Sequence, residues 1–482
     1  MQTALAAGVT DNLTAGVPGE GSVAGARDVP RLLVALPFVA GISLATFLFA
    51  YLVSRFIHEA IEAAATPGAG RLAVFAPGLL AVITALGGLR WTVLFTLSFA
   101  AFQRARQTAR RAPSTWPLVS IFVPAYNEAE NIEAAIESLL LLDYPRYEVI
   151  VVDDGSTDGT CGRAKRYAGS HGRCAIRVYR KPNGGKWSAH NFAFRRAIGE
   201  LVLCLDADSR VDPLSLRRMV VHMADPQVAA VAGQIRVRNR HNVLTRLQAM
   251  EYLMGNGCAR MAMSLNKTVL IVAGPLGLFR RCALEEVFLR YGRADGPLAE
   301  GQVDGPFEGD TFAEDFDLSM AVLSLGGRIV YEPAAISHTR APDSTLGLLS
   351  QRYRWCRGTI QVLRKYFRRA RVQHDLLRPG LLAWLTATYL FDLALLPIMY
   401  AVGIGMLIVV ATSHIGGLVL VGWAAVALLV NLNAAAMFAL LQGDSLGLLH
   451  ILPLYDIYQN FLVTPAWFIS IVDEVRGARM RW

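Results

Sequence analysis

Two aspartates separated by one residue follow an apolar run in the middle of the chain. The run Leu201–Leu205 has five apolar residues in succession, which indicates a buried parallel strand. Asp206 and Asp208 come just past its carboxyl end, where open α/β sheets bind ligands. Two carboxylates at this spacing on a turn can converge on one divalent cation, which can hold a diphosphate. Taken alone, the pair fits an acidic surface turn as well.

The chain around this pair alternates strand and helix patterns. Apolar runs bounded by turn residues predict four strands, at Ser120–Ala125, Glu148–Asp154, Ile176–Arg180 and Leu201–Leu205. Helical periodicity over Asn127–Leu142 and about Trp187–Ile198 predicts helical crossovers. This order predicts a parallel, doubly wound α/β sheet. The glycines match neither a dinucleotide-binding fingerprint nor a P-loop, which argues against both classes.

The pattern becomes mixed beyond Pro213. A helix-like stretch covers Asn242–Leu265. Further on, basic residues alternate with Leu, Trp, Tyr and Phe at helical spacing over Leu348–Val372. A basic amphipathic helix of this kind suits a membrane surface.

The composition favours a membrane protein with a soluble middle. Of the 482 residues, 54% are hydrophobic and 18% charged, and the apolar residues concentrate before about residue 103 and after about residue 380. The net charge of +9 comes from arginines that flank the apolar segments, as cytoplasmic anchors do, and no DNA- or RNA-binding module is recognisable. The six cysteines form no C-x-x-C pair, which predicts reduced thiols in a cytosolic domain.

We divide the chain into five parts. Residues 1–30 read as a disordered tail without a cleavable signal peptide, 31–103 as two transmembrane helices, and 104–345 as a cytosolic domain. Amphipathic interfacial helices follow over 346–379, and three or four transmembrane helices over 380–482. The stretch Leu72–Phe102 exceeds one span, so the helix is either long and tilted or ends at Arg90, and we expect Arg90 to mark its end.

Orientation follows from the arginines after the second apolar stretch. Arg104, Arg106, Arg110 and Arg111 follow it directly, and the positive-inside rule then places the middle domain in the cytoplasm. Three spans after that domain would leave the basic carboxyl end outside. A fourth span or an interfacial segment would resolve this conflict, and the sequence does not choose between them.

Six short motifs stand in order on the middle region. They are PAYNE (Pro124–Glu128), VVDDGS (Val151–Ser156), NGGK (Asn183–Lys186), DAD (Asp206–Asp208), AEDFD (Ala313–Asp317) and QRYRW (Gln351–Trp355). In this order, between membrane segments, the series resembles the membrane-embedded, processive family 2 glycosyltransferases, which include cellulose, chitin, hyaluronan and poly-N-acetylglucosamine synthases. The resemblance runs from about Val119 to Gly358. It implies a GT-A-type α/β nucleotide-sugar domain, with a mostly parallel, Rossmann-like sheet, inserted between transmembrane helices.

The resemblance also implies a donor site. It assigns Asp154 to the uracil ring, with Pro124 and Glu128 lining the same nucleotide pocket, although Asp154 could instead cap a helix. Lys186 and Asp206 would bind the nucleotide-sugar, although Lys186 could simply be a solvated lysine at a helix start. A Mg²⁺ or Mn²⁺ ion held by Asp206 and Asp208 would stabilise the charge of the departing UDP.

The acceptor side follows from the last two motifs. Asp315, next to Glu314, is the expected general base that takes the proton of the attacking hydroxyl. The family usually has Thr before these two acids, whereas this chain has Ala313.

The QRYRW residues share one helical face. Gln351, Arg354 and Trp355 are spaced i, i+3, i+4. The planar fork of Arg354 can grip pyrophosphate, and Trp355 offers a surface on which an acceptor sugar can stack. An interfacial aromatic and basic helix would show the same spacing.

These features predict an inverting, metal-dependent, processive β-glycosyltransferase. It would polymerise UDP-N-acetylglucosamine, or else UDP-glucose, and pass the growing polysaccharide through its own helices. Its partners would be the lipid bilayer and separate export or regulatory proteins, with no nucleic acid. Its place would be the bacterial inner membrane, with the catalytic domain in the cytoplasm. The alternatives are a non-processive transferase acting on a lipid or polyprenyl phosphate, and a non-catalytic membrane transporter or scaffold.

Overall fold

The computed structural model describes most of the middle region and parts of both apolar ends. The described residues are 71–108, 115–292, 298–373, 376–395 and 442–478, with scattered positions between 40 and 65 and between 405 and 439. The predicted tail lies outside the described residues, as do much of the first predicted span and most of 396–441.

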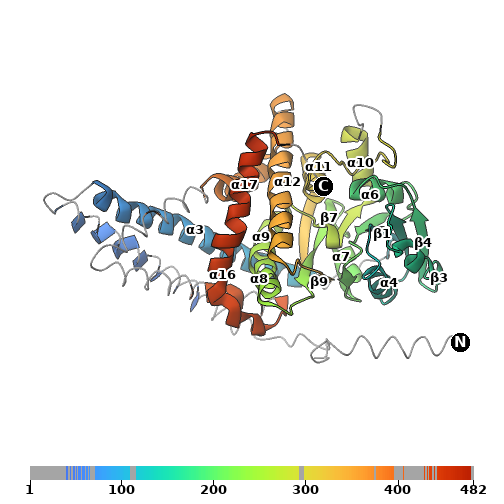
Figure 1. Ribbon diagram of the computed structural model, residues 1–482, viewed down its shortest axis with the longest axis horizontal. Helices are drawn as coiled ribbons and strands as arrows, with labels where there is room; N and C mark the ends of the chain where they lie inside the picture. The colour runs from blue at the N-terminus through green and yellow to red at the C-terminus, as the bar shows by residue number, and fades with distance from the viewer. Residues whose placement is uncertain are drawn as a thin grey trace.

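A nine-stranded sheet forms the centre of the middle region, with strand order β3-β4-β2-β1-β5-β8-β7-β9-β6 (Figure 1). The strands are β1 Val119–Ala125, β2 Tyr147–Asp153, β3 Gly169–His171, β4 Cys174–Arg180, β5 Leu201–Cys204, β6 Arg210–Val211, β7 Val228–Val237, β8 Gly277–Arg280 and β9 Arg328–Thr339. Strands β4, β2, β1 and β5 run parallel, so the four predicted strands and their parallel pairing are confirmed.

The expectation of a mostly parallel sheet is wrong for the second half. Strand β8 runs antiparallel to both β5 and β7, while β7 and β9 are parallel and β6 is antiparallel to β9. The sheet is therefore mixed. The chain reaches β8 after a long helical excursion, so the geometry of a short strand–helix–strand crossover does not fix its direction.

Alternate residues of the central strands enter two different cores. Ile150 and Val152 of β2 pack in one cluster, and Val149 and Val151 pack in the other. This alternation follows the two-residue period of a strand whose two faces are both covered. Helices α4 (Ile132–Leu140) and α7 (Ser215–His222) contribute to the second core, and α6 (Lys186–Phe194) contributes to the first.

Several helices complete the domain. The short helices α5 (Thr160–Lys165) and α10 (Arg281–Tyr291) lie beside the sheet. The helix predicted over Asn242–Leu265 is present, but it has three parts: α8 Val243–Glu251, the π-helical turn η1 Tyr252–Asn256, and α9 Gly257–Ser264.

Helices α11 (Glu314–Ser324) and α12 (Thr345–Val372) follow. The latter confirms the long basic helix of the sequence prediction. It lies beside α17 (Thr464–Val475), and the guanidinium of Arg357 bonds the carboxylate of Glu474 between them (Figure 1).

The apolar amino-terminal part includes α3 (Arg71–Thr108), a helix of 38 residues. Its stretch Ala85–Arg104 has the length and apolar character needed to cross a membrane, and it is the one helix of this kind in the described parts of the chain. The helix continues through Arg90, so the expectation that Arg90 ends it is wrong. The Arg90 guanidinium lies 4.5 Å from the centre of the Phe391 ring, which gives the charge an aromatic partner in mid-helix.

The apolar carboxyl-terminal part is broken into short helices. They are α13 Pro379–Leu385, η3 Thr386–Leu395, η4 Leu446–Ile451, α16 Leu452–Tyr458, η5 Gln459–Val463 and α17. Pro453 and Pro465 lie near the starts of α16 and α17, directly after η4 and η5, so each stands where the helical hydrogen-bond pattern changes. The predicted number of carboxyl-terminal spans depends on residues outside the described ones. All six cysteines are free thiols, as predicted.

Candidate active site

A cleft of about 2200 Å³ opens where β2 and β5 end and continues beyond α12 to α3, η3 and α17. Nine predicted site residues line it: Asp154, Lys186, Asp206, Asp208, Glu314, Asp315, Gln351, Arg354 and Trp355. Glu128 lines an adjoining hollow that shares Asp208 and Gln351 with the cleft. Pro124 lies within β1, paired with Val152, and is among the lining residues of neither.

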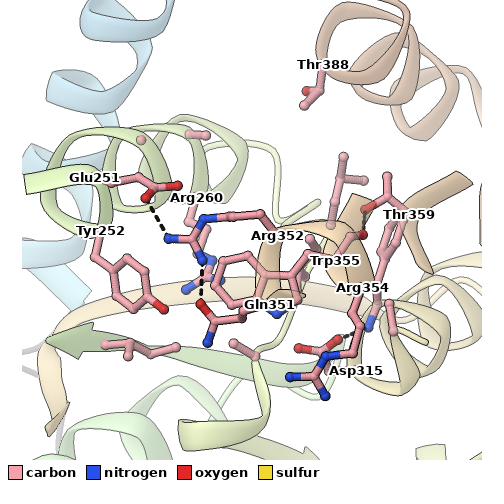
Figure 2. Close-up of a pocket in the computed structure, with 18 of the residues that line it drawn as sticks. Glu251, Tyr252, Arg260, Asp315, Gln351, Arg352, Arg354, Trp355, Thr359 and Thr388 are labelled. Carbon is pink, nitrogen blue, oxygen red and sulfur yellow. Dashed lines mark hydrogen bonds and ion pairs between the residues drawn. The ribbon is translucent and has the colours of Figure 1, made fainter. Parts of the chain in front are cut away.

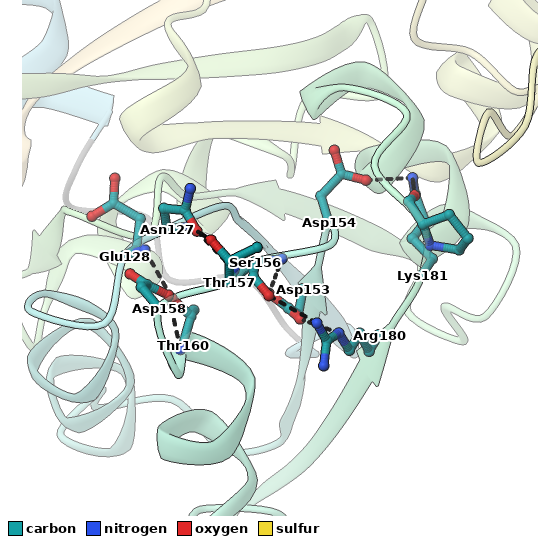
Figure 3. Close-up of polar contacts among 11 residues, drawn as sticks. Asn127, Glu128, Asp153, Asp154, Ser156, Thr157, Asp158, Thr160, Arg180 and Lys181 are labelled. Carbon is teal, nitrogen blue, oxygen red and sulfur yellow. Dashed lines mark hydrogen bonds and ion pairs between the residues drawn. The ribbon is translucent and has the colours of Figure 1, made fainter.

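Asp154 lies directly after β2 and holds the NGGK loop. Its carboxylate forms an ion pair with Lys181 (Figure 3). It also accepts hydrogen bonds from the backbone N–H groups of Gly184 at 3.1 Å and Gly185 at 2.8 Å. The helix-capping alternative is wrong, because the cap of α5 is Gly159. Asp154 therefore joins two of the predicted motifs, and Lys181 is a buried partner that the sequence reading gave no role.

The PAYNE and VVDDGS loops form one unit (Figure 3). The backbone N–H of Asn127 donates to Ser156 Oγ at 2.9 Å, and the N–H of Thr157 donates back to Asn127 Oδ1 at 2.9 Å. The N–H of Glu128 donates to Thr160 Oγ1 at 2.8 Å. These reciprocal bonds fix the edge of the sheet beside Asp154, so Glu128 and its neighbours shape that edge of the site.

Lys186 connects three motifs. It is the first residue of α6, and its Nζ lies 2.7 Å from Asp206 Oδ1 and 3.0 Å from Glu314 Oε1. Burial disfavours the ammonium, but the charges of these two carboxylates raise the pKa of Lys186 well above its usual range. Lys186 does stand at a helix start with a side chain that is 39% exposed, and its two ion pairs direct the ammonium into the cleft. A β-carbon on Gly274 would lie 2.8 Å from Nζ and 3.2 Å from Asp206 Oδ1, so the Gly274 backbone packs closely against this ion pair.

Asp206 and Asp208 have the chemistry of a cation site. Burial and the charge of Asp206 raise the pKa of Asp208, which accepts hydrogen bonds from Ser209 Oγ at 3.0 Å and Thr339 Oγ1 at 3.3 Å. Two carboxylates on one turn at the edge of the cleft fit a hard divalent cation bound by oxygen ligands.

Asp315 and Glu314 open α11 at the middle of the cleft. Burial, reinforced by the charge of Glu314, raises the pKa of Asp315 to about 6. Burial acts in the same direction on Glu314, but the ion pair with Lys186 outweighs it and lowers the pKa of Glu314. The two neighbouring acids therefore differ in proton affinity, and the difference comes from one lysine.

Ala313 precedes these acids where the family usually has Thr. It occupies the cap position of α11 without a side-chain hydrogen bond. A β-carbon placed on Gly358 of α12 would lie 2.6 Å from the Ala313 β-carbon. The start of α11 thus packs closely on α12, against a residue that itself has no side chain.

The QRYRW residues of α12 face the cleft as their spacing predicts. Figure 2 shows Arg354 next to Asp315 and Trp355 beside Tyr252. The Trp355 side chain is 40% exposed, and the ring centres of Tyr252 and Trp355 lie 6.3 Å apart. The sequence reading gave no role to Arg352, Glu251 or Tyr252. The one signal in the sequence for these residues is that Glu251 is an acidic residue within an otherwise apolar stretch.

A second acidic group lies outside the predicted site. Carboxylate oxygens of Glu308, Asp310 and Asp317 lie within 4.8 Å of one another. The Lys365 ammonium fills the space between them, at 2.6 Å, 3.0 Å and 2.6 Å respectively. Burial raises the pKa of Asp317 to about 7, although Lys365 opposes this. We assign this cluster to the packing of α11 against α12.

Comparisons with known proteins match the part of the chain that carries Asp154, Lys186, Asp206 and Asp208 to a glycosyltransferase family. Residues 120–288 match the model of glycosyl transferase family 2. Poly-β-1,6-N-acetyl-D-glucosamine synthases of Staphylococcus epidermidis and Staphylococcus aureus are 30% and 31% identical over 250 residues, which are 52% of this chain and 56% of each relative. The chain thus spans about half the length of the curated relatives it matches.

A solved structure supports the fold. A mannosyltransferase of Pyrobaculum calidifontis, in complex with GDP-Man and Mn²⁺, is 24% identical, with a TM-score of 0.55, and the match covers 83% of this chain and 100% of that chain. The predicted GT-A-type fold is confirmed, with a mixed sheet. Over residues 120–288 the chain is thus similar to glycosyl transferase family 2.

Proposed function

We propose that this chain, through its family 2 glycosyltransferase domain, extends a β-linked N-acetylglucosamine polymer from UDP-N-acetylglucosamine, with UDP-glucose as the second donor to consider. The observation that carries the proposal is the convergence of Asp154, Lys186, Asp206, Asp315 and Trp355 on one cleft. The names of the curated relatives support N-acetylglucosamine as the sugar.

The donor would bind at the strand ends. Its uracil would lie against Asp154, whose carboxylate the glycine loop already orients. Its diphosphate would lie near Lys186, Asp206 and Asp208. A Mg²⁺ or Mn²⁺ ion held by the two aspartates would neutralise the diphosphate and help UDP to leave. The positive charge of Lys186 would offset the repulsion between the Asp206 and Glu314 carboxylates while the donor enters.

The chemical step would use Asp315. Its pKa of about 6 leaves the carboxylate ionised at neutral pH and still basic enough to take a proton. The acceptor hydroxyl would lose its proton to Asp315 while its oxygen forms the bond to the anomeric carbon and the bond to UDP breaks. One in-line attack of this kind inverts the anomeric centre. Arg354 lies beside Asp315, where its guanidinium can meet the leaving diphosphate (Figure 2).

The acceptor would stack on Trp355 and extend along the cleft. Because the cleft continues to α3, η3 and α17, we propose that the polymer leaves between these apolar helices and crosses a bacterial inner membrane. The catalytic domain would face the cytoplasm, and separate proteins would export the polymer or regulate its synthesis. The length and apolar character of Ala85–Arg104 support a place in the bilayer.

UDP release by detergent-purified protein tests the proposal. The assay compares UDP-N-acetylglucosamine, UDP-glucose and UDP-glucuronate with Mg²⁺, Mn²⁺ or EDTA, and sizes any product. We expect release with UDP-N-acetylglucosamine, loss of release in EDTA, and a long product. Short products would favour a non-processive transferase with a lipid acceptor. Absence of both UDP release and UDP binding would favour a transporter or scaffold.

A further inference from the structure

A buried ion pair lies behind the acceptor side of the cleft. Arg352 Nη2 of α12 lies 2.6 Å from Glu251 Oε2 of α8, and the two side chains are 2% and 16% exposed. The hydroxyl of Tyr458, from α16, donates to the same carboxylate oxygen at 2.6 Å. Three helices that are far apart in the sequence therefore meet at one carboxylate.

The guanidinium of this pair also touches two cleft residues (Figure 2). Arg352 Nη1 donates to Gln351 Oε1 at 2.5 Å. The guanidinium lies over the Trp355 ring, with its central carbon 4.3 Å from the ring centre. A cation over an indole face is attractive and depends on orientation, so a fixed guanidinium restricts the indole.

The helix around Glu251 has an unusual local geometry. Glu251 is the last residue of α8, and the π-helical turn η1 begins at Tyr252. Such turns are rare and occur often at functional sites. Glu251, just before this turn, reaches Arg352, and Tyr252, its first residue, reaches Trp355, with the two rings inclined at 36°. Two neighbouring side chains at the start of the π-helical turn thus contact Arg352 and Trp355, on the acceptor side of the cleft.

Packing alone does not account for the pair. A buried ion pair is often no more stable than apolar residues of the same shape. The same helix carries a second pair, Arg357 with Glu474, whose side chains are 3% and 9% exposed. That pair joins α12 to α17 and is not among the residues that line the cleft. It offers a matched control for burial and charge without contact to Trp355.

We propose that Glu251 and Arg352 are positioning residues, which hold Gln351 and Trp355 in the orientation that receives the acceptor sugar. Glu251 fixes the guanidinium plane, and that plane fixes the amide of Gln351 and the indole of Trp355. The inference rests on the proposed function, since the acceptor is the growing polymer. It adds that the acceptor subsite is set from α8 and α16, on the side away from the donor.

The first test separates acceptor binding from donor binding. With a β-1,6-linked N-acetylglucosamine pentamer as acceptor, Glu251→Gln is expected to raise the acceptor KM on the order of tenfold and leave the donor KM unchanged. Arg352→Lys, which keeps the charge but loses the planar fork, is expected to do the same. The double variant is expected to be no worse than Arg352→Lys, because both changes break one unit. Glu474→Gln is expected to leave both KM values unchanged.

A second measurement needs no turnover. The contribution of Trp355 to fluorescence and near-ultraviolet circular dichroism is obtained by subtracting the spectrum of Trp355→Phe in each background. We expect this contribution to change in Glu251→Gln and to stay as in the unmodified protein in Glu474→Gln. An unchanged contribution, or equal acceptor KM values in folded Glu251→Gln and the unmodified protein, overturns the positioning role. An unmodified protein that turns over no donor overturns the proposed function, and the spectra then still decide the orientation of Trp355.

Discussion

The two ends of the cleft are built by different means. The proposed donor end consists of loops that follow the parallel strands, with Asp154 after β2 and Asp206 after β5. The proposed acceptor end consists of side chains from α8, α12 and α16 that meet at Glu251. Strand pairing fixes the backbone on which donor residues stand, whereas ion pairs between helices fix the acceptor wall. The acceptor wall can therefore change by side-chain substitution while the donor end stays intact.

The sharpest test of this division lies where the two ends meet. Asp315→Asn removes the proposed base but keeps the shape and the hydrogen bond from the Phe316 N–H. We expect transfer to fall by about 10²–10⁴-fold, because the asparagine amide cannot take the proton. UDP binding, measured by calorimetry, should stay within experimental error. Unchanged UDP release in the variant would remove Asp315 from the base role and leave Glu314 as the next residue to test.

A change of backbone should affect the donor end alone. A β-carbon on Gly184 would overlap the carbonyl oxygen of Gly301, so Gly184→Ala must displace the loop that Asp154 holds. We expect the donor KM to rise on the order of a hundredfold, while the acceptor KM does not change. Gly162→Ala is the control, because a β-carbon there meets no atom within 4 Å. A parallel rise in the acceptor KM would show that the two ends are not independent.

The dependence of kcat/KM on pH should report the ionisation of Asp315, which lies where the two ends of the cleft meet. Asp315 must be ionised to act, and its pKa is about 6, so kcat/KM should rise with pH through about 6 and level off above it. At pH 5 the rate should be about tenfold below the plateau, since about one site in ten is then ionised. Rates measured between pH 4.5 and 8 check this expectation. A profile that is flat down to pH 5 would mean that Asp315 does not limit the reaction.

The smallest expected effect concerns the stacking surface. Trp355→Ala should raise the acceptor KM by about two- to tenfold, the range of one aromatic contact, with the donor KM unchanged. The acceptor KM of Trp355→Phe should lie between those of the unmodified protein and Trp355→Ala, because phenylalanine keeps a smaller aromatic ring. Initial rates at varied pentamer concentration give the comparison. Equal KM values in all three proteins would place the acceptor elsewhere in the cleft.

The contrast between strand-end loops and contacts between helices also explains which site residues the sequence predicts. Asp206 and Asp208 are predicted because a buried strand followed by acids is a local pattern, and the carboxyl ends of parallel strands share one edge. The role expected of Asp154 comes from the family resemblance. The face of α12 was found because helical spacing places Gln351 and Trp355 together. These features depend on neighbours within a few residues, so the sequence carries them directly.

The features that were missed depend on distant contacts. Glu251 and Arg352 are 101 residues apart, and no local spacing pairs them. The direction of β8 was missed for the same reason, since its four residues carry no sign of the strand beside which they lie. Arg90 looked like a helix end because its partner, Phe391, belongs to the other apolar part of the chain.

Strand β8 also sets how the two halves of the sheet can move. It pairs four residues with β5 and three with β7, so a narrow seam joins the parallel half to the rest. The turn Gly274–Leu276 leads into it, and Gly274 lies against Lys186 and Asp206. Any twist between the halves must therefore be taken up directly behind the carboxylates. Hydrogen exchange of the β8 amide protons would therefore report donor binding, since exchange slows when the pairing of β8 with β5 and β7 becomes more stable.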